Sequence, residues 1–516
     1  MHDHKLEQYL QYYFGYSSFR KGQKAIIQSV LNKEHVFAVL PTGTGKSICY
    51  QLPAMMLDGT VIVVSPLLSL MEDQVKQLKA NGFKKVAALN SMLTYQEKES
   101  ILSRIGSYKL IYVSPEMLQS NRIIRKIKQL QINLFVIDEA HCISQWGHEF
   151  RPDYLRITAI HQTLGNPPLL ALTATATPDV QRDIIKVLQL EQVSTFIYPM
   201  DKPNISLVLE SVTQLHEKQE RIAELVNTYR VPTLIYFSSR EETAKVAAYL
   251  QSAVKDRSIA FYHGGLDNQD RLLIQQQFMN NQIDIVCCTN AFGMGINKKD
   301  IQLVIHYHIP SQIESFIQEL GRAGREGQEV VSLTLFHESD AFIPRRLIES
   351  ELPSLSLIKQ QLDIIYQTEP TFEEVKQSFL LQANGVESQW RFFQYQLERL
   401  GLLRQANWQV KTISQQDVLE ALEITMTERM GYKERKLSEM LQWVYTDHCR
   451  RNALFRHFQN DVQEPTFMCC SFCDFKWDHW QPEEMVREKT VQEWHQLLYE
   501  LLYQGDQNEK QSRTTD

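Results

Sequence analysis

A glycine-bearing turn between a strand-like run and a helix-like run restricts the fold of this chain more than any other feature. The stretch AVLPTGTGKSICY carries the turn, with Gly43 and Gly45 inside it. Backbone N–H groups of such a turn can surround phosphate oxygens, helped by the positive end of the following helix. Leu40 stands where the strict phosphate-loop pattern has its first glycine, so the match is incomplete. The turn still predicts a strand–loop–helix unit and therefore an α/β fold.

Two blocks of alternating strand and helix patterns run from residue 36 to about residue 338. Short apolar runs mark the strands of the first block: VFAVL, TVIVVS, KLIYVS, LFVIDE and LLALTAT. The pattern restarts with TLIYFSS, SIAFYH, IDIVCCT, LVIHYHI and SLTLF, and YPMDKPNISLVLE between the blocks is a predicted hinge. Apolar runs separated by helical segments are typical of parallel sheets covered by helices. We therefore predict two tandem α/β domains with a binding crevice between them.

Composition and termini exclude several other classes of protein. A chain of 516 residues is too long for one core, and 43% apolar residues are ordinary for a globular protein. No run is long and apolar enough to cross a bilayer, and MHDHKLEQYL lacks the pattern of a secretory signal. Eight cysteines, four of them from Cys449 to Cys473, favour a metal site in a reducing cytoplasm over disulfides. A net charge of −7 argues against coating of nucleic acid but permits a local basic groove.

The chain changes character beyond residue 340. SLIKQQLDIIYQ, TFEEVKQSFLLQ and VESQWRFFQYQLERLG predict three short helices, with a capping box of Thr371 and Glu374 on the second. LLRQANWQVKTI predicts a small hairpin after Gly401. Three helices and a hairpin are typical of a winged helix-turn-helix, but a generic helical bundle fits the pattern equally well. QPEEMVREKTVQEWHQLLYELLYQ predicts a closing helix, and GDQNEKQSRTTD predicts a disordered tail.

An acidic motif complements the glycine-bearing turn. LFVIDEAH ends a buried strand with Asp138 and Glu139. Lys46 can neutralise the terminal phosphates of a nucleotide, and Ser47 and Asp138 can hold Mg²⁺. Glu139 can then orient or deprotonate the attacking water. Together the two motifs predict a nucleoside triphosphatase.

Residues outside these two motifs can complete the nucleotide site. Arg322 and Arg325 in FIQELGRAGREG are three residues apart on a predicted helix, and neighbouring glycines leave room for them to approach phosphates. FGYSSFRKGQ offers Tyr16, Arg20 and Gln23, an aromatic face for a base and an amide for the polar edge of adenine. The alternative for the two arginines is a solvated surface.

An aromatic and basic segment follows the acidic pair directly. DEAHCISQWGHEFRPDY places Trp146, Phe150 and Arg151 just beyond Glu139. Aromatic rings can stack on nucleic-acid bases, and an arginine can meet a phosphate or stack on a base. The alternative is that the two aromatic rings belong to the core.

Taken together, these motifs resemble those of the RecQ family of superfamily 2 DNA helicases, over roughly residues 10–338. They occur in order as FGYSSFRKGQ, PTGTGKS, VSPLLSLMEDQV, YVSPE, DEAHCISQWGHEFRPDY, LTATAT, IYFSSR, YHGGL, TNAFGMGIN and QELGRAGREG. The resemblance implies two RecA-like domains and ATP-dependent 3′→5′ translocation with unwinding of DNA in repair, recombination or fork restart. It also implies that the aromatic-rich loop senses single-stranded DNA and transmits its presence to the ATPase site.

The resemblance assigns roles to individual residues. It gives catalysis to Lys46, Asp138, Glu139, Arg322 and Arg325, and nucleotide binding to Tyr16, Arg20, Gln23, Thr42, Gly43, Thr44, Gly45, Lys46 and Ser47. Ser47 and Asp138 are the expected Mg²⁺ ligands. Trp146, Phe150, Arg151, Ser65 and Thr289 are the expected nucleic-acid contacts. Thr173 and Thr175 of LTATAT are expected to couple hydrolysis to domain movement.

Four cysteines near the end of the chain predict a Zn²⁺ site. TDHCRRNALFRHF and PTFMCCSFCDF supply Cys449, Cys469, Cys470 and Cys473, and four soft ligands suit tetrahedral Zn²⁺. The zinc module of the RecQ family has one cysteine followed by CxxCxxC, whereas Lys476 occupies the last position of that pattern here. Cys469 is the predicted substitute, with His448 and His479 as alternatives. Without a metal, the four residues would be free buried thiols.

The predicted fold class is α/β, with two tandem RecA-like parallel-sheet domains followed by a mostly helical region that carries a zinc-binding module. The predicted divisions are an ATP-binding domain at 1–200, a second RecA-like domain at 201–340, a helical or winged-helix region at 341–413, a helical hairpin with the zinc module at 414–480, and a C-terminal helix with a tail at 481–516. In the family a winged helix follows the zinc module, and residues 474–516 are too few for one. The family's strand-separating hairpin therefore has no named counterpart here.

The predicted function is that of an ATP-dependent DNA helicase. The alternatives are a DNA-stimulated translocase with little unwinding, a non-catalytic DNA-binding scaffold that uses ATP as a switch, and, disfavoured by the aromatic-rich loop, an RNA helicase. Expected cofactors are ATP, Mg²⁺ and Zn²⁺. Single-stranded, tailed or branched DNA is the expected partner, and the resemblance adds single-stranded-DNA-binding protein. We expect a monomer in the cytoplasm with no membrane association.

Overall fold

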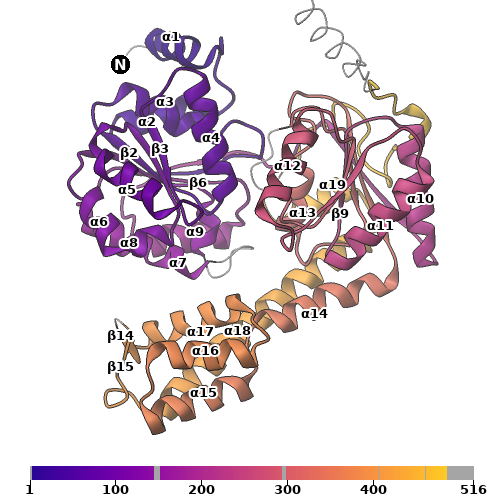
Figure 1. Cartoon of the computed structure of the whole chain (residues 1–516). Coiled ribbons are helices and arrows are strands. Elements are labelled where there is room, and N and C mark those ends of the chain that lie inside the picture. Colours follow the sequence, from indigo (N-terminus) through magenta and orange to yellow (C-terminus); the bar gives the residue numbers. More distant parts are fainter. Residues whose placement is uncertain (1–2, 145–150, 293–297, 405, 460, 485–516) are drawn as a thin grey trace, which may run out of the picture.

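The computed structural model describes residues 3–144, 151–292, 298–404, 406–459 and 461–484. The chain forms two α/β domains, a helical arm (residues 342–430) and a cysteine module (residues 445–484), as Figure 1 shows. Each α/β domain contains one parallel sheet, and the remainder is mainly helical. The predicted fold class is therefore confirmed.

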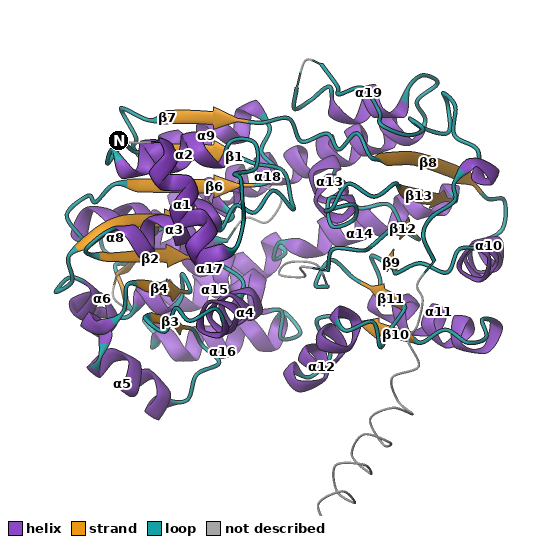
Figure 2. Ribbon diagram, turned by 90° about the horizontal axis from the view of Figure 1, so that it is seen from above, coloured by secondary structure: helices purple, strands orange, loops and turns teal. Residues whose placement is uncertain are grey.

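The first domain is built on a seven-stranded sheet in the order β3-β4-β2-β5-β6-β1-β7 (Figure 2), and every pairing in it is parallel. Its central strands are buried on both faces: on β2, Ile62 faces one core cluster and Val63 faces the other. This double burial explains the continuous apolar runs of the sequence. The strands are β1 Val36–Val39, β2 Thr60–Val64, β3 Val86–Leu89, β4 Leu110–Val113, β5 Ile132–Ile137, β6 Leu169–Thr173 and β7 Ser194–Ile197.

Helices cover both faces of this sheet. They are α1 Asp3–Phe14, α2 Gln23–Leu31, α3 Ile48–Met56, α4 Leu68–Ala80, α5 Tyr95–Ser103, α6 Asn121–Ile127, α7 Pro152–Leu155, α8 Ile157–Thr163 and α9 Pro178–Val187, with short 3₁₀ turns η1 Ile105–Ser107, η2 Met117–Gln119 and η3 Ala140–Ile143. None of the helices that the structure describes has both the length and the apolar character needed to cross a bilayer.

The second domain has a six-stranded sheet in the order β10-β11-β9-β12-β13-β8, again with parallel pairings throughout. Its strands are β8 Ile205–Ser211, β9 Thr233–Tyr236, β10 Ile259–Tyr262, β11 Ile285–Cys288, β12 Leu303–His306 and β13 Val330–Phe336. Its helices are α10 Leu215–Thr228, α11 Arg240–Ala253, α12 Asn268–Met279 and α13 Ile313–Leu320, followed by the 3₁₀ turn η4 Glu338–Ala341.

Only the first half of the predicted hinge agrees with the structure. Residues 198–204 connect the domains without regular structure, but the rest of YPMDKPNISLVLE forms most of β8, an edge strand that pairs with β13 from Ile205 to Ser211. Pro203 and Asn204 are typical of a hinge, but the seven residues that follow them pair with β13 and are therefore held in a sheet.

The arm contains the three predicted helices, the predicted hairpin and the capping box of Thr371 and Glu374, all of which are confirmed. Its core includes Phe379 and Phe393, whose rings stack with centroids 5.1 Å apart. The sequence patterns did not indicate that a 30-residue helix would run through the arm. Its elements are α14 Phe342–Glu351, α15 Leu355–Thr368, α16 Phe372–Gln382, α17 Glu387–Arg399, β14 Leu403–Arg404, β15 Asn407–Trp408 and α18 Gln415–Val444.

Helix α18 connects the arm to the rest of the molecule. Its first half contributes Val418 and Leu422 to the arm core, and its last turn carries Trp443, whose ring lies 4.7 Å from that of Phe316 on α13. The cysteine module follows, with α19 Arg450–Phe455 and the 3₁₀ turn η5 Trp477–His479. The predicted closing helix lies almost entirely outside the described residues.

Candidate nucleotide site and cysteine cluster

The predicted nucleotide residues, apart from Thr44, line a cleft between the two α/β domains. Strands β1, β5 and β6 are parallel, so the loops after them lie at the same edge of the sheet. This edge carries the glycine-bearing turn and Asp138, and the end of α13 forms the facing wall with Arg322 and Arg325. The cleft has a volume of about 330 Å³.

The glycine-bearing turn has the backbone that a phosphate loop requires. Gly43 and Gly45 have φ angles of +85° and +76°, a region that disfavours other residues. Ser47 is the N-cap of α3, and its side chain makes no capping hydrogen bond. Its hydroxyl is therefore not committed to the helix, which leaves it suited to a metal ion at the helix N-terminus.

The acidic pair faces the loop lysine. Lys46 Nζ lies 3.5 Å from Glu139 Oε1, and both side chains are largely buried. Burial, followed by the charge of Glu139, raises the pKa of Asp138 to about 7. A divalent cation beside Asp138 would reverse this shift because it stabilises the charged carboxylate. The donor set therefore fits Mg²⁺ held by Asp138 and Ser47.

A hydrogen bond joins the acidic motif to LTATAT. His141 Nδ1 and Thr173 Oγ1 lie 3.0 Å apart, and both residues are fully buried. Burial, followed by the charge of Lys46, lowers the pKa of His141 to about 3, so its imidazole is neutral at pH 7. Thr173 also accepts the backbone N–H of Leu40 at the start of the phosphate loop, so it contacts both nucleotide motifs.

The second domain approaches the phosphate loop closely. A side chain at Gly321 would overlap the hydroxyl of Thr42, and one at Gly43 would press on the side chain of Arg325. Arg322 is 5% exposed, and its Nε has no hydrogen-bond partner among the residues that the structure describes. Burial, followed by the charge of Arg322, lowers the pKa of Arg325 to about 10. Two crowded guanidinium groups beside Lys46 provide the charge that a polyphosphate would neutralise.

The three residues expected to bind the adenine base all line this cleft, but they differ in the contacts that they make. Tyr16 is 54% exposed and free to offer a ring face. Gln23 is committed to the phosphate loop, because its amide donates to Thr44 O at 2.9 Å and to Gly45 O at 3.0 Å. Arg20 donates to Gly43 O. In this structure Arg20 and Gln23 therefore brace the loop.

The expected nucleic-acid contacts are only partly visible. Trp146 and Phe150 lie outside the described residues. Arg151 Nη1 donates to Pro66 O at 3.1 Å, which ties the end of the aromatic-rich segment to the turn after Ser65. Ser65 and Thr289 are both buried, so neither presents an exposed hydroxyl here.

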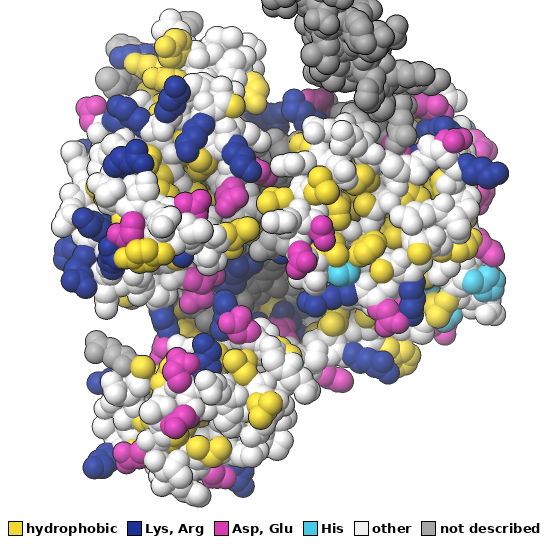
Figure 3. Space-filling model, in the orientation of Figure 1, with side chains coloured by type: hydrophobic (Ala, Val, Ile, Leu, Met, Phe, Trp, Pro, Cys, Tyr) yellow, Lys and Arg dark blue, Asp and Glu magenta, His cyan; other side chains and the backbone are white. Residues whose placement is uncertain are grey.

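The arm docks beside this segment. Arg156, just after α7, pairs with Glu398 of α17, and Arg391 Nη1 lies 3.9 Å from Asp153 Oδ2. On the face shown in Figure 3, basic and acidic side chains are interspersed over both α/β domains and the arm, in line with the modest net charge of −7.

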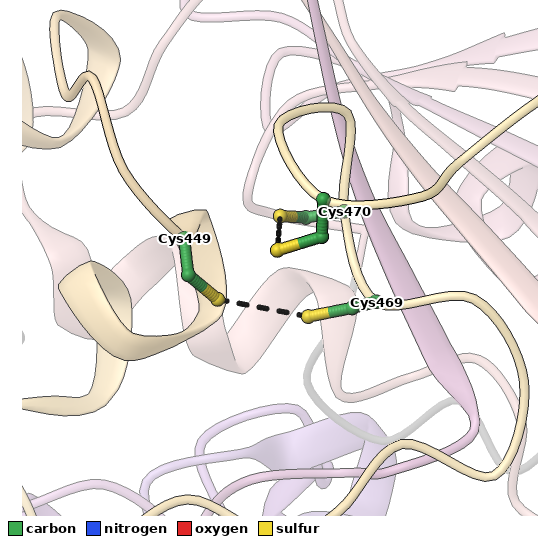
Figure 4. A group of neighbouring side chains, drawn as sticks. Cys449, Cys469 and Cys470 are labelled. Atoms are coloured by element: carbon green, nitrogen blue, oxygen red, sulfur yellow. Dashed lines mark hydrogen bonds between the residues drawn. The ribbon is translucent and has the colours of Figure 1, made fainter.

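The four cysteines meet at one point of the cysteine module. Their sulfur atoms all lie within 4.8 Å of one another. Cys449, at the N-cap of α19, points toward Cys469 with its Sγ 3.6 Å away, and Cys470 Sγ lies 3.5 Å from Cys473 Sγ (Figure 4). Tetrahedral Zn²⁺ with bonds of about 2.3 Å places its sulfur ligands roughly 3.8 Å apart. The cluster therefore fits Zn²⁺, and Cys469 is close enough to be the fourth ligand.

The thiols of the cluster differ in pKa. A hydrogen bond from Cys469 lowers the pKa of Cys470 to about 4, whereas the same interaction raises the pKa of Cys469. Burial raises the pKa of Cys473 to about 12. Four thiolates cannot share this space without a cation. The alternative ligands His448 and His479 are exposed and do not belong to the cluster.

The cysteine module covers the edge of the second sheet. Leu207 of β8 forms a parallel bridge with Cys470, its N–H donates to Cys469 O at 3.1 Å, and its carbonyl accepts from Ser471 N at 2.9 Å. Ser206 Oγ donates to Met468 O at 2.5 Å. The cluster is therefore attached to β8 through backbone contacts on both sides of Cys470.

Sequence reasoning missed the residues that connect these parts. Lys202 and Asn204, in the segment between the domains, hydrogen-bond to the turn that carries Arg322 and Arg325. Arg451 of α19 pairs with Asp201 in the same segment. A lone lysine, asparagine or arginine has no characteristic spacing, so no sequence pattern indicated these contacts.

Two protein-family descriptions match this chain. Residues 20–184 match the family description DEAD/DEAH box helicase, and residues 217–327 match Helicase conserved C-terminal domain. The two matched segments correspond to the two α/β domains, and the nucleotide cleft lies between them. The fold and the cleft are thus those of a superfamily 2 helicase core.

Individual relatives define the family. The chain is 41% identical over 501 residues to the probable ATP-dependent DNA helicase RecS of Bacillus subtilis, covering 96% of this chain and 98% of that protein. It is 38% identical over 393 residues to the ATP-dependent DNA helicase RecQ of Bacillus subtilis, covering 74% of this chain and 65% of that protein. The chain belongs to the RecQ family of ATP-dependent DNA helicases, as its motifs predicted.

Solved structures of more distant helicases share the fold. The DEAD-box helicase Mss116 bound to single-stranded RNA has a TM-score of 0.57 at 17% identity, covering 88% of this chain and 89% of that one. The DUF1998 helicase MrfA bound to DNA has a TM-score of 0.56 at 20% identity, covering 65% of this chain and 51% of that one. At these identities the likeness concerns the fold alone.

Proposed function

We propose that this chain hydrolyses ATP to move 3′→5′ along single-stranded DNA and to unwind duplex DNA in repair or recombination. The observation that carries the proposal is the convergence, in one cleft, of a phosphate loop, an acidic pair and two arginines from the opposite domain. Membership in a family of ATP-dependent DNA helicases supports DNA as the substrate. The direction follows from the RecQ resemblance.

In the proposed mechanism, each side chain has one task. Lys46 and the loop N–H groups hold the terminal phosphates, and Glu139 orients or deprotonates the attacking water. Arg322 and Arg325 neutralise the charge that develops on the transferred phosphoryl group when the domains close. Mg²⁺, when bound by Ser47 and Asp138, supplies further neutralisation of the phosphate oxygens. Thr173 and Thr175 report the state of the nucleotide to the neighbouring motifs.

We further propose that the four cysteines hold Zn²⁺ in a structural role, since a closed set of four thiolates leaves no position for a substrate. Trp146, Phe150 and Arg151 are proposed to contact single-stranded DNA, together with Ser65 and Thr289 once the domains move. The proposed partners are tailed or branched DNA and single-stranded-DNA-binding protein, and the proposed setting is the cytoplasm, where the chain acts as a monomer.

Strand displacement on tailed duplexes tests the proposal. With ATP and Mg²⁺ we expect unwinding of a duplex with a 3′ single-stranded tail and none with a 5′ tail. Trp146→Ala is expected to lose DNA stimulation of ATP hydrolysis by about tenfold while keeping nucleotide affinity, because a stacking contact is worth about 1–3 kcal/mol per base. Nucleotide affinity is measured separately with a fluorescent ATP analogue.

Other outcomes lead to different conclusions. DNA-stimulated ATP hydrolysis without unwinding of either duplex would identify a translocase and direct attention to the arm. DNA binding without any ATP hydrolysis would identify a scaffold. Unwinding from the 5′ tail would contradict the proposed direction.

A further inference from the structure

The segment between the α/β domains hydrogen-bonds to the turn that carries Arg322 and Arg325. We call Asp201, Lys202 and Asn204 the linker clamp. Lys202 Nζ donates to Gly321 O at 2.5 Å and to Ala323 O at 3.0 Å. Gly321 is the C-cap of α13, so the ammonium group lies on carbonyls at the negative end of that helix. Lys202 therefore fixes the direction in which the chain leaves α13.

Asn204 holds the other side of the same turn. Its Nδ2 donates to Gly324 O at 3.1 Å and to Gln328 O at 2.7 Å. Gly324 has a φ of +63°, and a side chain there would overlap the Asn204 amide, so the contact requires glycine. Arg322 and Arg325 thus lie on a turn whose two ends are both fixed by the linker clamp.

The cysteine module in turn holds the linker clamp. Arg451 of α19 forms an ion pair with Asp201, and the two residues are only 1% and 2% exposed. Its guanidinium also donates to Lys202 O at 3.0 Å and to Ile205 O. Gln463 adds a backbone N–H to Asp201 Oδ2 at 2.9 Å and an amide donor to Asp201 O at 2.6 Å. A buried arginine bonded to a carboxylate and two carbonyls sets the path of this segment.

We infer that Lys202 is a positioning residue for Arg322 and Arg325, and that Arg451 makes the placement of these arginines depend on the cysteine module. The inference rests on the proposed ATP hydrolysis. Lys202 does not line the cleft, so it acts through the turn and not through the nucleotide. Burial, followed by the charges of Arg325, Arg20 and Arg322, lowers the pKa of Lys202 to about 7, which agrees with its buried position behind the arginines that line the cleft.

Steady-state ATP hydrolysis with saturating single-stranded DNA tests the role of Lys202. Lys202→Met is expected to lower kcat by about tenfold and leave KM for ATP within about twofold, because misplaced arginines weaken the transition state more than the bound substrate. Lys202→Arg is expected to recover most of kcat, since a guanidinium can donate to both carbonyls. The matched control is Lys433→Met, which removes another buried lysine whose partner, Glu351, is 3.2 Å away in the arm. The control is expected to keep kcat.

A second pair of substitutions tests the role of Arg451. Arg451→Met is combined with Asp201→Asn so that no lone buried carboxylate remains. The double variant is expected to retain its zinc, because Arg451 is outside the cluster, and to show the same loss of kcat as Lys202→Met.

The results separate the inference from the proposed function. Unchanged kcat in Lys202→Met, or an equal loss in Lys433→Met, would overturn the positioning role of Lys202. Unchanged kcat in the double variant would overturn the dependence on the cysteine module. A wild-type chain that does not hydrolyse ATP with DNA would refute the proposed function, and the inference with it.

Discussion

Glu139→Gln is expected to lower DNA-stimulated ATP hydrolysis by about 10²–10⁴-fold while leaving ATP binding intact. Glu139 lies two residues beyond the end of β5, with Oε1 3.5 Å from Lys46 Nζ and a backbone φ of +49°. An amide of the same shape keeps these contacts but cannot accept a proton from water. The Lys46 ammonium also loses its nearest carboxylate, so ATP affinity is expected to stay equal or rise. Turnover and binding of a fluorescent ATP analogue measure the two effects separately.

The matched control for this variant is Glu99→Gln. Glu99 pairs with Arg122 at the surface of the same domain, and a surface ion pair contributes about 0–1 kcal/mol. Its loss is expected to leave turnover unchanged. Substantial hydrolysis by Glu139→Gln would mean that another group handles the attacking water, and the assignment of Glu139 would be wrong.

Cys470→Ser is expected to release zinc and to lower the midpoint of thermal unfolding by roughly 10 °C, because structural zinc contributes about 10–16 kcal/mol of binding energy to a fold. Cys470 is fully buried, and its backbone is bridged to Leu207 of the second sheet. Loss of the metal is therefore expected to loosen the edge of that sheet as well as the module. Metal analysis of the purified chain and a thermal melt measure both effects.

Further substitutions identify the fourth ligand. Cys469→Ser is expected to lose zinc in the same way, because its Sγ lies 3.6 Å from that of Cys449. His448→Ala and His479→Ala serve as controls and are expected to keep the metal, since both side chains are exposed. Full zinc in Cys469→Ser would show that the cluster uses another ligand.

Local sequence patterns predicted the parts of this molecule whose chemistry is contained in a few consecutive residues. The turn with Gly43 and Gly45, and the buried strand before Asp138, each combine an apolar run with reactive side chains. Two α/β domains followed from repetition of such runs. Short strands with weak patterns were missed: β3, Val86–Leu89, has two alanines, and β7, Ser194–Ile197, is half exposed.

Contacts between distant segments could not be predicted from one sequence. Lys202 meets Gly321 across 119 residues, and Arg451 meets Asp201 across 250. These contacts arise only when the chain is folded, and the residues involved resemble ordinary charged linker or helix residues. The length of α18 was missed for a related reason: one half packs in the arm and the other against α13, so no single apolar stripe runs along it.

The attachment of the cysteine module to β8 has a consequence for the order of folding. Strand β8 is at the edge of its sheet, and Leu207 obtains its outer backbone partners from Cys469 and Ser471, more than 260 residues later in the chain. During synthesis at about 5–20 residues per second, roughly 15–50 s pass before the outer side of that strand can be covered. An uncovered edge is a template for pairing with another chain, so this interval is when the nascent protein is most exposed to aggregation.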